Sequence, residues 1–163
     1  GSMENSSTGN NNSIFGYQSL NKNSSGNNNS AFGYQSLYNH ISGNENVAIG
    51  NATLYTDTSG TSNTAIGSGS MKYNTSGSNN TAVGFESLIF NNQGSFNVAI
   101  GNESLNQNYT GNNNVGIGNK AAFSNSSGLS NIAIGVASLY NNTAKSYLIA
   151  IGDSALFHNG ENA

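Results

Sequence analysis

The chain has 163 residues and a net charge of −3, and charged residues make up only 7% of it, where about 25% is usual. It contains no proline, cysteine or tryptophan, so neither a disulfide nor a thiolate metal site holds the fold. Because it also lacks a basic patch and a long apolar run, we expect no nucleic-acid binding and no membrane insertion of this segment.

Two columns of glycine reveal a repeat of 17 residues. The first column is Gly9, Gly26, Gly43, Gly60, Gly77, Gly94, Gly111 and Gly128, and the second, which we expect to form turns, is Gly16, Gly33, Gly50, Gly67, Gly84, Gly101, Gly118, Gly135 and Gly152. No insertion or deletion breaks the phase, as expected for coils that stack on one another. The sequence therefore predicts an all-β fold, a parallel β-solenoid of nine coils.

The repeat also divides the chain into parts. We expect residues 1–7 to be an expression scar and lead-in, residues 8–160 to form one solenoid domain, and residues 161–163 to begin a truncated tenth repeat. Positions 1–17 of each unit are counted from residue 8, which places the glycines at positions 2 and 9. In the ninth copy Lys145 replaces the first glycine.

Positions 5 to 8 of each unit have the composition of a short strand. Residues 46–49 and 97–100 are examples: β-branched side chains are enriched and a glycine follows. Nine such strands, stacked at about 4.8 Å, would make a parallel sheet roughly 40 Å long. Position 8 is always Ile, Val or Phe and position 13 is mostly Leu, so we expect these two columns to form a thin core.

Positions 10 to 15 admit two interpretations. Apolar residues there often fall at i, i+3 and i+4, as in Tyr34, Leu37 and Tyr38, which suits a single helical turn. Position 10 is polar in other copies, so a second short strand is the alternative.

Asparagine at position 5 predicts a ladder. The column is Asn12, Asn29, Asn46, Asn63, Asn80, Asn97, Asn114 and Asn131, and position 16 is also mostly asparagine. Stacked amides can donate and accept along the axis and satisfy turn backbone. For the flanking asparagines we favour a simple role in turns.

Position 7 is small and apolar in all copies but the first. The column comprises Ala31, Ala48, Ala65, Ala82, Ala99, Ala133 and Ala150, with Ile14 and Gly116 as exceptions. If position 8 faces the core, position 7 faces outward, and we predict a contact between identical subunits there. Packing beneath the same chain's second arm is the alternative.

The repeat resembles two groups of surface proteins. Units such as Asn-Val-Ala-Ile-Gly at 46–50 resemble the YadA-like head repeats of trimeric autotransporter adhesins. The longer unit at 26–37 is similar to arrays in phage and virus tail fibres that carry an endosialidase-type chaperone domain. This resemblance implies a homotrimeric extracellular fibre, on a cell surface or virion, that contacts a host receptor or glycan.

The sequence offers little for catalysis. Glu86 and Glu103 share position 11 of adjacent copies, which could mimic a glycosidase carboxylate pair, but two exposed side chains explain them better. His40 and His158 lie far apart, and Asp57 and Asp153 do not recur in register, as calcium-binding repeats require. We expect no enzyme, no cofactor and no metal.

The sequence therefore favours a structural segment of a surface fibre. The alternative is a solenoid module that binds ice or carbohydrate. For ice, the position 17 column (Thr58, Thr75, Thr143, but also Ile41, Asn92 and Tyr109) is irregular. For carbohydrate, the candidates are aromatic residues at position 14, although packing is the simpler role: Tyr38, Tyr55, Phe123, Tyr140 and Phe157.

Overall fold

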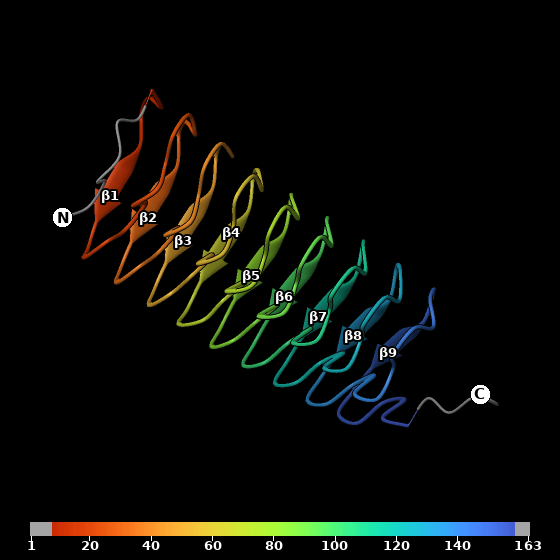
Figure 1. Ribbon diagram of the computed structural model, residues 1–163. Helices are drawn as coiled ribbons and strands as arrows, with labels where there is room; N and C mark the ends of the chain where they lie inside the picture. The colour runs from red at the N-terminus through yellow and green to blue at the C-terminus, as the bar shows by residue number, and fades with distance from the viewer. Residues whose placement is uncertain (1–7, 159–163) are drawn as a thin grey trace.

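The computed structural model describes residues 8–158, and this part of the chain contains nine short strands in one parallel sheet (Figure 1). They are β1 (Ser13–Phe15), β2 (Ser30–Phe32), β3 (Val47–Ile49), β4 (Thr64–Ile66), β5 (Thr81–Val83), β6 (Val98–Ile100), β7 (Val115–Ile117), β8 (Ile132–Ile134) and β9 (Ile149–Ile151). Each strand pairs with the next in a register of 17 residues, as Ala48 does with Ala65. The predicted β-solenoid is confirmed. The expected lead-in at 1–7 and the tenth repeat at 161–163 lie outside the described residues.

Hydrogen bonds between coils extend well beyond the strands. The Leu54 amide donates to the carbonyl of Ser70 over 3.1 Å, and the Asn79 amide donates to the carbonyl of Thr61 over 2.9 Å. Equivalent bonds recur from coil to coil in the turns. Three-residue strands could not stand alone, so stability must come from bonds distributed around the whole coil.

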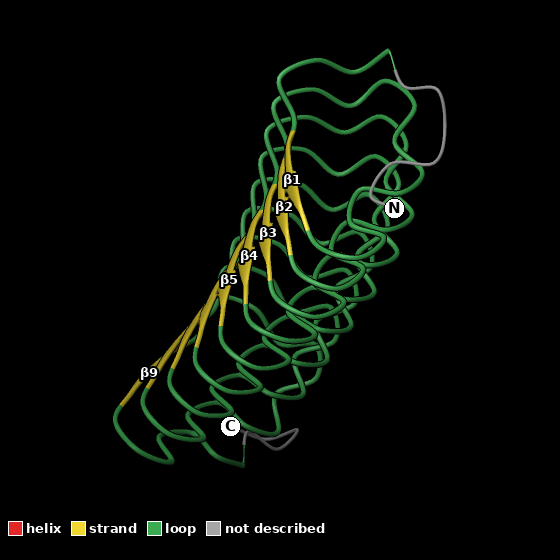
Figure 2. Ribbon diagram, turned by 90° about the vertical axis from the view of Figure 1, so that its left-hand side faces the viewer, coloured by secondary structure: helices red, strands yellow, loops and turns green. Residues whose placement is uncertain are grey.

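The second arm of each coil is neither a strand nor a helical turn. It is a run of turns, and Figure 2 shows strands on one side of the coil only. Two residues per coil have left-handed backbone there, at positions 11 and 13, as in Ala52 (φ 50°) and Leu54 (φ 51°). Thr53 and Leu54 are consecutive and both fully buried. A strand would send one of them outward, so the left-handed residues are what let both side chains enter the core.

The core is a narrow column of alanine and leucine. Position 13 is buried as expected in coils one to eight, whereas Leu156 in the ninth coil is 42% exposed. Position 8 points outward: Ile49 is 41% exposed and Ile100 is 40% exposed. The side chains of the strand therefore point in the directions opposite to those predicted. Position 7 points inward, and the prediction for position 8 was wrong.

The alanine column packs inside its own chain. All seven alanines are between 0% and 3% exposed: Ala31, Ala48, Ala65, Ala82, Ala99, Ala133 and Ala150. The predicted subunit contact through them was wrong, and packing beneath the second arm is what the structure shows. Position 7 must be small because little space separates the strand from the second arm. A Cβ added at Gly116 would lie 2.6 Å from the Ser104 hydroxyl oxygen and 3.0 Å from Cγ of Leu105.

Candidate functional site

The predicted asparagine ladder at position 5 is present and buried. The Asn80 side-chain amide donates to Oδ1 of Asn63 over 3.1 Å and to the Gly94 carbonyl over 2.9 Å. Its own Oδ1 accepts the backbone and side-chain N–H groups of Asn97 at 3.0 and 3.1 Å. Each amide thus satisfies a buried turn carbonyl and connects two neighbouring coils.

Position 16 carries a second ladder parallel to the first. The Asn91 amide donates to Oδ1 of Asn74 over 2.8 Å and to the Gly94 carbonyl over 2.9 Å. That carbonyl therefore accepts from both ladders, since Asn80 also donates to it. The glycine at position 2 is where the two ladders meet. A Cβ on Gly94 would lie 2.4 Å from Oδ1 of Asn91.

A buried ionisable pair interrupts the second ladder. His40 and Asp57 occupy position 16 of adjacent coils, and both are fully buried. Nδ1 of His40 lies 2.8 Å from Oδ2 of Asp57, and Nε2 lies 2.8 Å from the Gly43 carbonyl oxygen. The other carboxylate oxygen accepts from Asn74 over 2.6 Å and from the Gly60 amide over 3.2 Å. Both ring nitrogens of His40 and both carboxyl oxygens of Asp57 therefore have hydrogen-bond partners, so the pair is fully satisfied where it replaces two asparagines.

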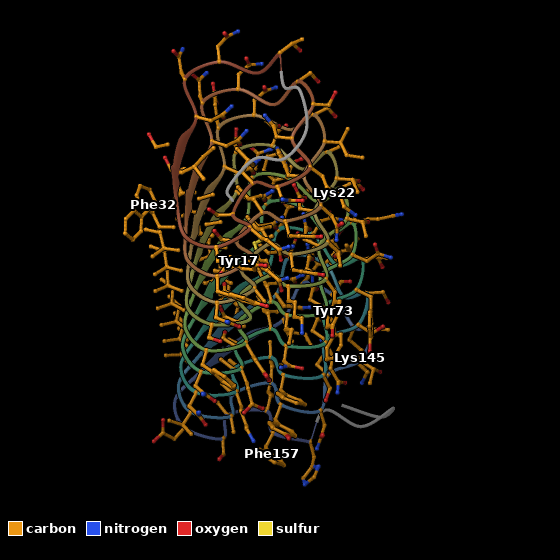
Figure 3. All side chains as sticks on the ribbon, turned by 60° about the vertical axis from the view of Figure 1, so that its left-hand side comes forward. Tyr17, Lys22, Phe32, Tyr73, Lys145 and Phe157 are labelled. Atoms are coloured by element: carbon orange, nitrogen blue, oxygen red, sulfur yellow. The ribbon has the colours of Figure 1, made fainter. Side chains whose placement is uncertain are left out.

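The outward side of the sheet forms a continuous surface, called here the outer sheet face. It consists of positions 6 and 8, namely Ser13, Phe15, Ser30, Phe32, Val47, Ile49, Thr64, Ile66, Thr81, Val83, Val98, Ile100, Val115, Ile117, Ile132, Ile134, Ile149 and Ile151. None of these residues is charged. From β3 onward every one is Val, Ile or Thr. Figure 3 shows Phe32 projecting from the ribbon at this face.

The carboxylates and histidines considered for catalysis form no site. Glu103 pairs with Lys120 at 3.6 Å, and neither Glu86 nor Glu103 is buried. His158 lies 3.0 Å from the Asn141 amide, away from the buried His40. Among the described residues no group of three or more His, Asp or Glu side chains could hold a metal ion.

Aromatic side chains stack along the second arm. Rings at position 14 lie nearly parallel on adjacent coils: Tyr38 and Tyr55 are 5.2 Å apart, and Phe123 and Tyr140 are 5.0 Å apart. All four are half-buried, which agrees with a packing role. The prediction that position 14 serves mainly in packing describes these copies.

In the middle of the array the aromatic residues no longer occupy position 14. In coils four to six the aromatic residue moves to position 15, as Tyr73 and Phe90, and then to position 17, as Tyr109. These rings are more exposed, at 40%, 38% and 44%. Together with three polar residues they line a hollow of about 320 Å³, called here the aromatic groove, formed by Thr56, Tyr73, Thr75, Phe90, Asn92 and Tyr109.

Comparison of the chain with protein-family models, with curated proteins and with solved structures found no match in any of the three. Within residues 8–158 no helix has the length and hydrophobicity of a membrane span.

Proposed function

We propose that this chain is a structural segment of an extracellular surface fibre, of a cell or a virion, and that copies of it assemble side by side through the outer sheet face. The observation that carries the proposal is the uncharged surface that every coil contributes to and that is β-branched from β3 onward. At about 4.8 Å per coil it is roughly 40 Å long, and at ~10 Å wide it covers ~400 Å². A patch of this size is comparable to the largest apolar patch on a typical monomer, which is often functional.

The partner that fits this face best is another copy of the chain. Its side chains repeat at the spacing of stacked strands, so a partner must repeat at the same spacing to bury every coil. A second copy of the chain has the same spacing and so meets that requirement, and most homo-oligomers have closed symmetry. A homotrimer is the state that the resemblance to adhesin heads and tail fibres implies. The regular coils, bonded around their whole circumference, suit a stiff shaft.

The assembly can be tested by analytical ultracentrifugation. We expect the wild-type chain to sediment as a trimer, and the double variant Ile66→Lys/Ile100→Lys to sediment as a monomer, because two buried, unpaired ammonium groups oppose association. Val136→Lys is the matched control, since Val136 is 48% exposed but lies at position 10, off the outer sheet face. This variant should remain trimeric.

Far-UV circular dichroism shows whether the variants keep the fold. A wild-type chain that is monomeric at every concentration would contradict the assembly. So would a double variant that stays folded and trimeric.

A further inference from the structure

The aromatic groove arises from a local break in an otherwise strict repeat. Position 14 is aromatic in coils two and three and again in coils seven to nine, but it is Lys72, Ile89 and Asn106 in coils four to six. In those coils the aromatic rings occupy positions 15 and 17 instead. These columns flank the inward-pointing position 16, so their side chains form two outward rows with a hollow between them. Packing alone does not require this change, because the coils on either side stack their rings at position 14.

The rings of the groove are held in a fixed arrangement. Tyr73 and Phe90 stack with centroids 5.3 Å apart and planes 7° apart, whereas Tyr109 lies 6.2 Å from Phe90 and is tilted by 37°. All three lie on a backbone that is hydrogen-bonded from coil to coil; for example, the Tyr73 amide donates to the Ile89 carbonyl over 2.9 Å. A ligand would therefore meet a preformed apolar surface, as is usual for small-molecule sites.

The polar groups of the groove are positioned and uncharged. The Thr75 hydroxyl donates to the Asn92 carbonyl over 3.0 Å, and the Thr56 hydroxyl donates to the Asn74 carbonyl over the same distance. Both hydroxyl oxygens keep lone pairs that can accept. The side-chain oxygen of Asn92 accepts from Thr75, while its N–H groups and the Tyr73 and Tyr109 hydroxyls bond to no other described residue.

We propose that the aromatic groove binds a neutral oligosaccharide. Such a ligand carries apolar C–H surfaces that pack on aromatic rings, and hydroxyl groups that match the free donors and acceptors of Asn92, Thr75 and the two tyrosines. The neutral lining argues against anionic ligands, since nucleic acids and phosphates require cationic partners. The Lys72 ammonium is near but lies over the Tyr73 ring, 5.2 Å from its centre, and is not part of the lining.

The groove remains accessible in the assembly proposed above. Figure 3 places Phe32, on the outer sheet face, on one side of the ribbon and Tyr73 toward the other. Sugar binding is thus independent of self-association, and either proposal can fail alone. The groove spans coils three to six, a length of about 14 Å, which suits a short run of sugar rings.

The binding can be tested with the whole chain and a defined set of ligands. The probes are neutral hexasaccharides: β-1,4-linked glucose, mannose, xylose and N-acetylglucosamine, and α-1,4-linked glucose. Saturation-transfer NMR detects binding, and calorimetric titration gives the affinity. We expect at least one hexasaccharide to bind at millimolar concentration or below. Tyr109→Ala should weaken that binding by about tenfold or more, because it removes one wall of the groove.

Two further variants separate the groove from general effects. Tyr34→Ala is the matched control: Tyr34 is 48% exposed, stacks on Tyr17 and does not line the groove, so binding should not change. Tyr109→Phe keeps the ring and should lose much less affinity than Tyr109→Ala. If none of the five sugars binds the wild-type chain, or if a folded Tyr109→Ala variant binds as tightly as wild type, the proposal is wrong.

Discussion

At the scale of single residues, the interior of this protein depends on amides as much as on apolar side chains. The asparagines at positions 5 and 16 are buried in nearly every coil described, and their amides bond to backbone and to each other. Buried polar groups are tolerated only when they are satisfied. Each of these positions therefore favours asparagine in every coil, because the hydrogen-bond partner of each asparagine is the asparagine at the same position one coil away.

The position 5 ladder could be predicted from sequence because a single residue type recurs in register. The direction of the strand's side chains could not. Positions 6, 7 and 8 are all apolar or β-branched in most copies, as in Val47, Ala48 and Ile49, so hydrophobicity does not distinguish the two faces. Side-chain volume is the better guide, because position 7, which packs against the buried second arm, is alanine in seven coils and glycine in one, and only the first coil has a larger residue there, Ile14.

The His40–Asp57 pair gives a test of the second ladder. His40→Asn leaves the buried Asp57 carboxyl group without its His40 partner and should lower the free energy of unfolding by about 3 kcal/mol or more. Asp57→Asn should cost less, roughly 1 kcal/mol, because a neutral imidazole can accept from the new amide and still donate to the Gly43 carbonyl. The double variant restores two asparagines in register and should equal or exceed wild type.

Chemical denaturation of the four proteins, followed by circular dichroism, measures this cycle. Additive losses in the double variant would show that the two residues are not coupled. Equal losses in the two single variants would contradict the unequal roles proposed for His40 and Asp57.

At the scale of the element, the turns between strand and second arm are fixed by backbone geometry. All nine glycines at position 9 have φ between 120° and 139°, a region that L-residues rarely occupy. The glycine pattern allowed these turns to be predicted from sequence. The second arm could not be predicted, because Leu54 and its equivalents adopt a left-handed conformation that leucine seldom takes. The stacking of each second arm against its equivalents in the neighbouring coils offsets the energetic cost of that conformation.

Two glycines in one coil separate the effect of backbone conformation from that of space. Gly67, at position 9, has φ 126°, and a Cβ there would lie 2.4 Å from the Gly84 carbonyl oxygen. Gly69, at position 11, has φ 70°, and its Cβ would approach nothing closer than 3.2 Å. Ala52 and Ala137 occupy the same position in other coils. Gly67→Ala should therefore cost about 3 kcal/mol or more, and Gly69→Ala less than about 1 kcal/mol.

The midpoints of thermal unfolding, compared at equal protein concentration, measure this difference. Similar midpoints for the two variants would show that the position 9 turn is not held as the structure describes.

At the scale of the whole molecule, the strict period is a consequence of stacking. Both ladders, the leucine column and the coil-to-coil backbone bonds connect residues separated by 17 or nearly 17. The period was evident in the sequence and fixed the fold class. The aromatic groove was not predicted, because it lies where the aromatic residues leave their usual column. A scan for residues displaced from a column, rather than for columns, would have found it.

The period predicts how the chain tolerates deletions. Removing residues 127–143, one full unit, joins position 17 to position 1 and leaves every column in register. This variant should fold and should lose only a few degrees of melting temperature. Removing residues 127–142 takes away one residue fewer but displaces every later column by one position, so the coils after it should not stack.

Circular dichroism and hydrogen exchange of the two deletion variants distinguish these outcomes. Equal protection of residues 144–158 in both would contradict the requirement for register.

The constant rise per coil gives the aromatic groove a fixed height along the rod. Each 17-residue unit gained or lost on one side of the groove moves it by about 5 Å relative to that end, without altering its lining. Gene duplication acting on such an array would change the distance of the groove from that end and leave the residues of the groove unchanged. The number of units on each side of the groove therefore sets its distance from each end of the solenoid.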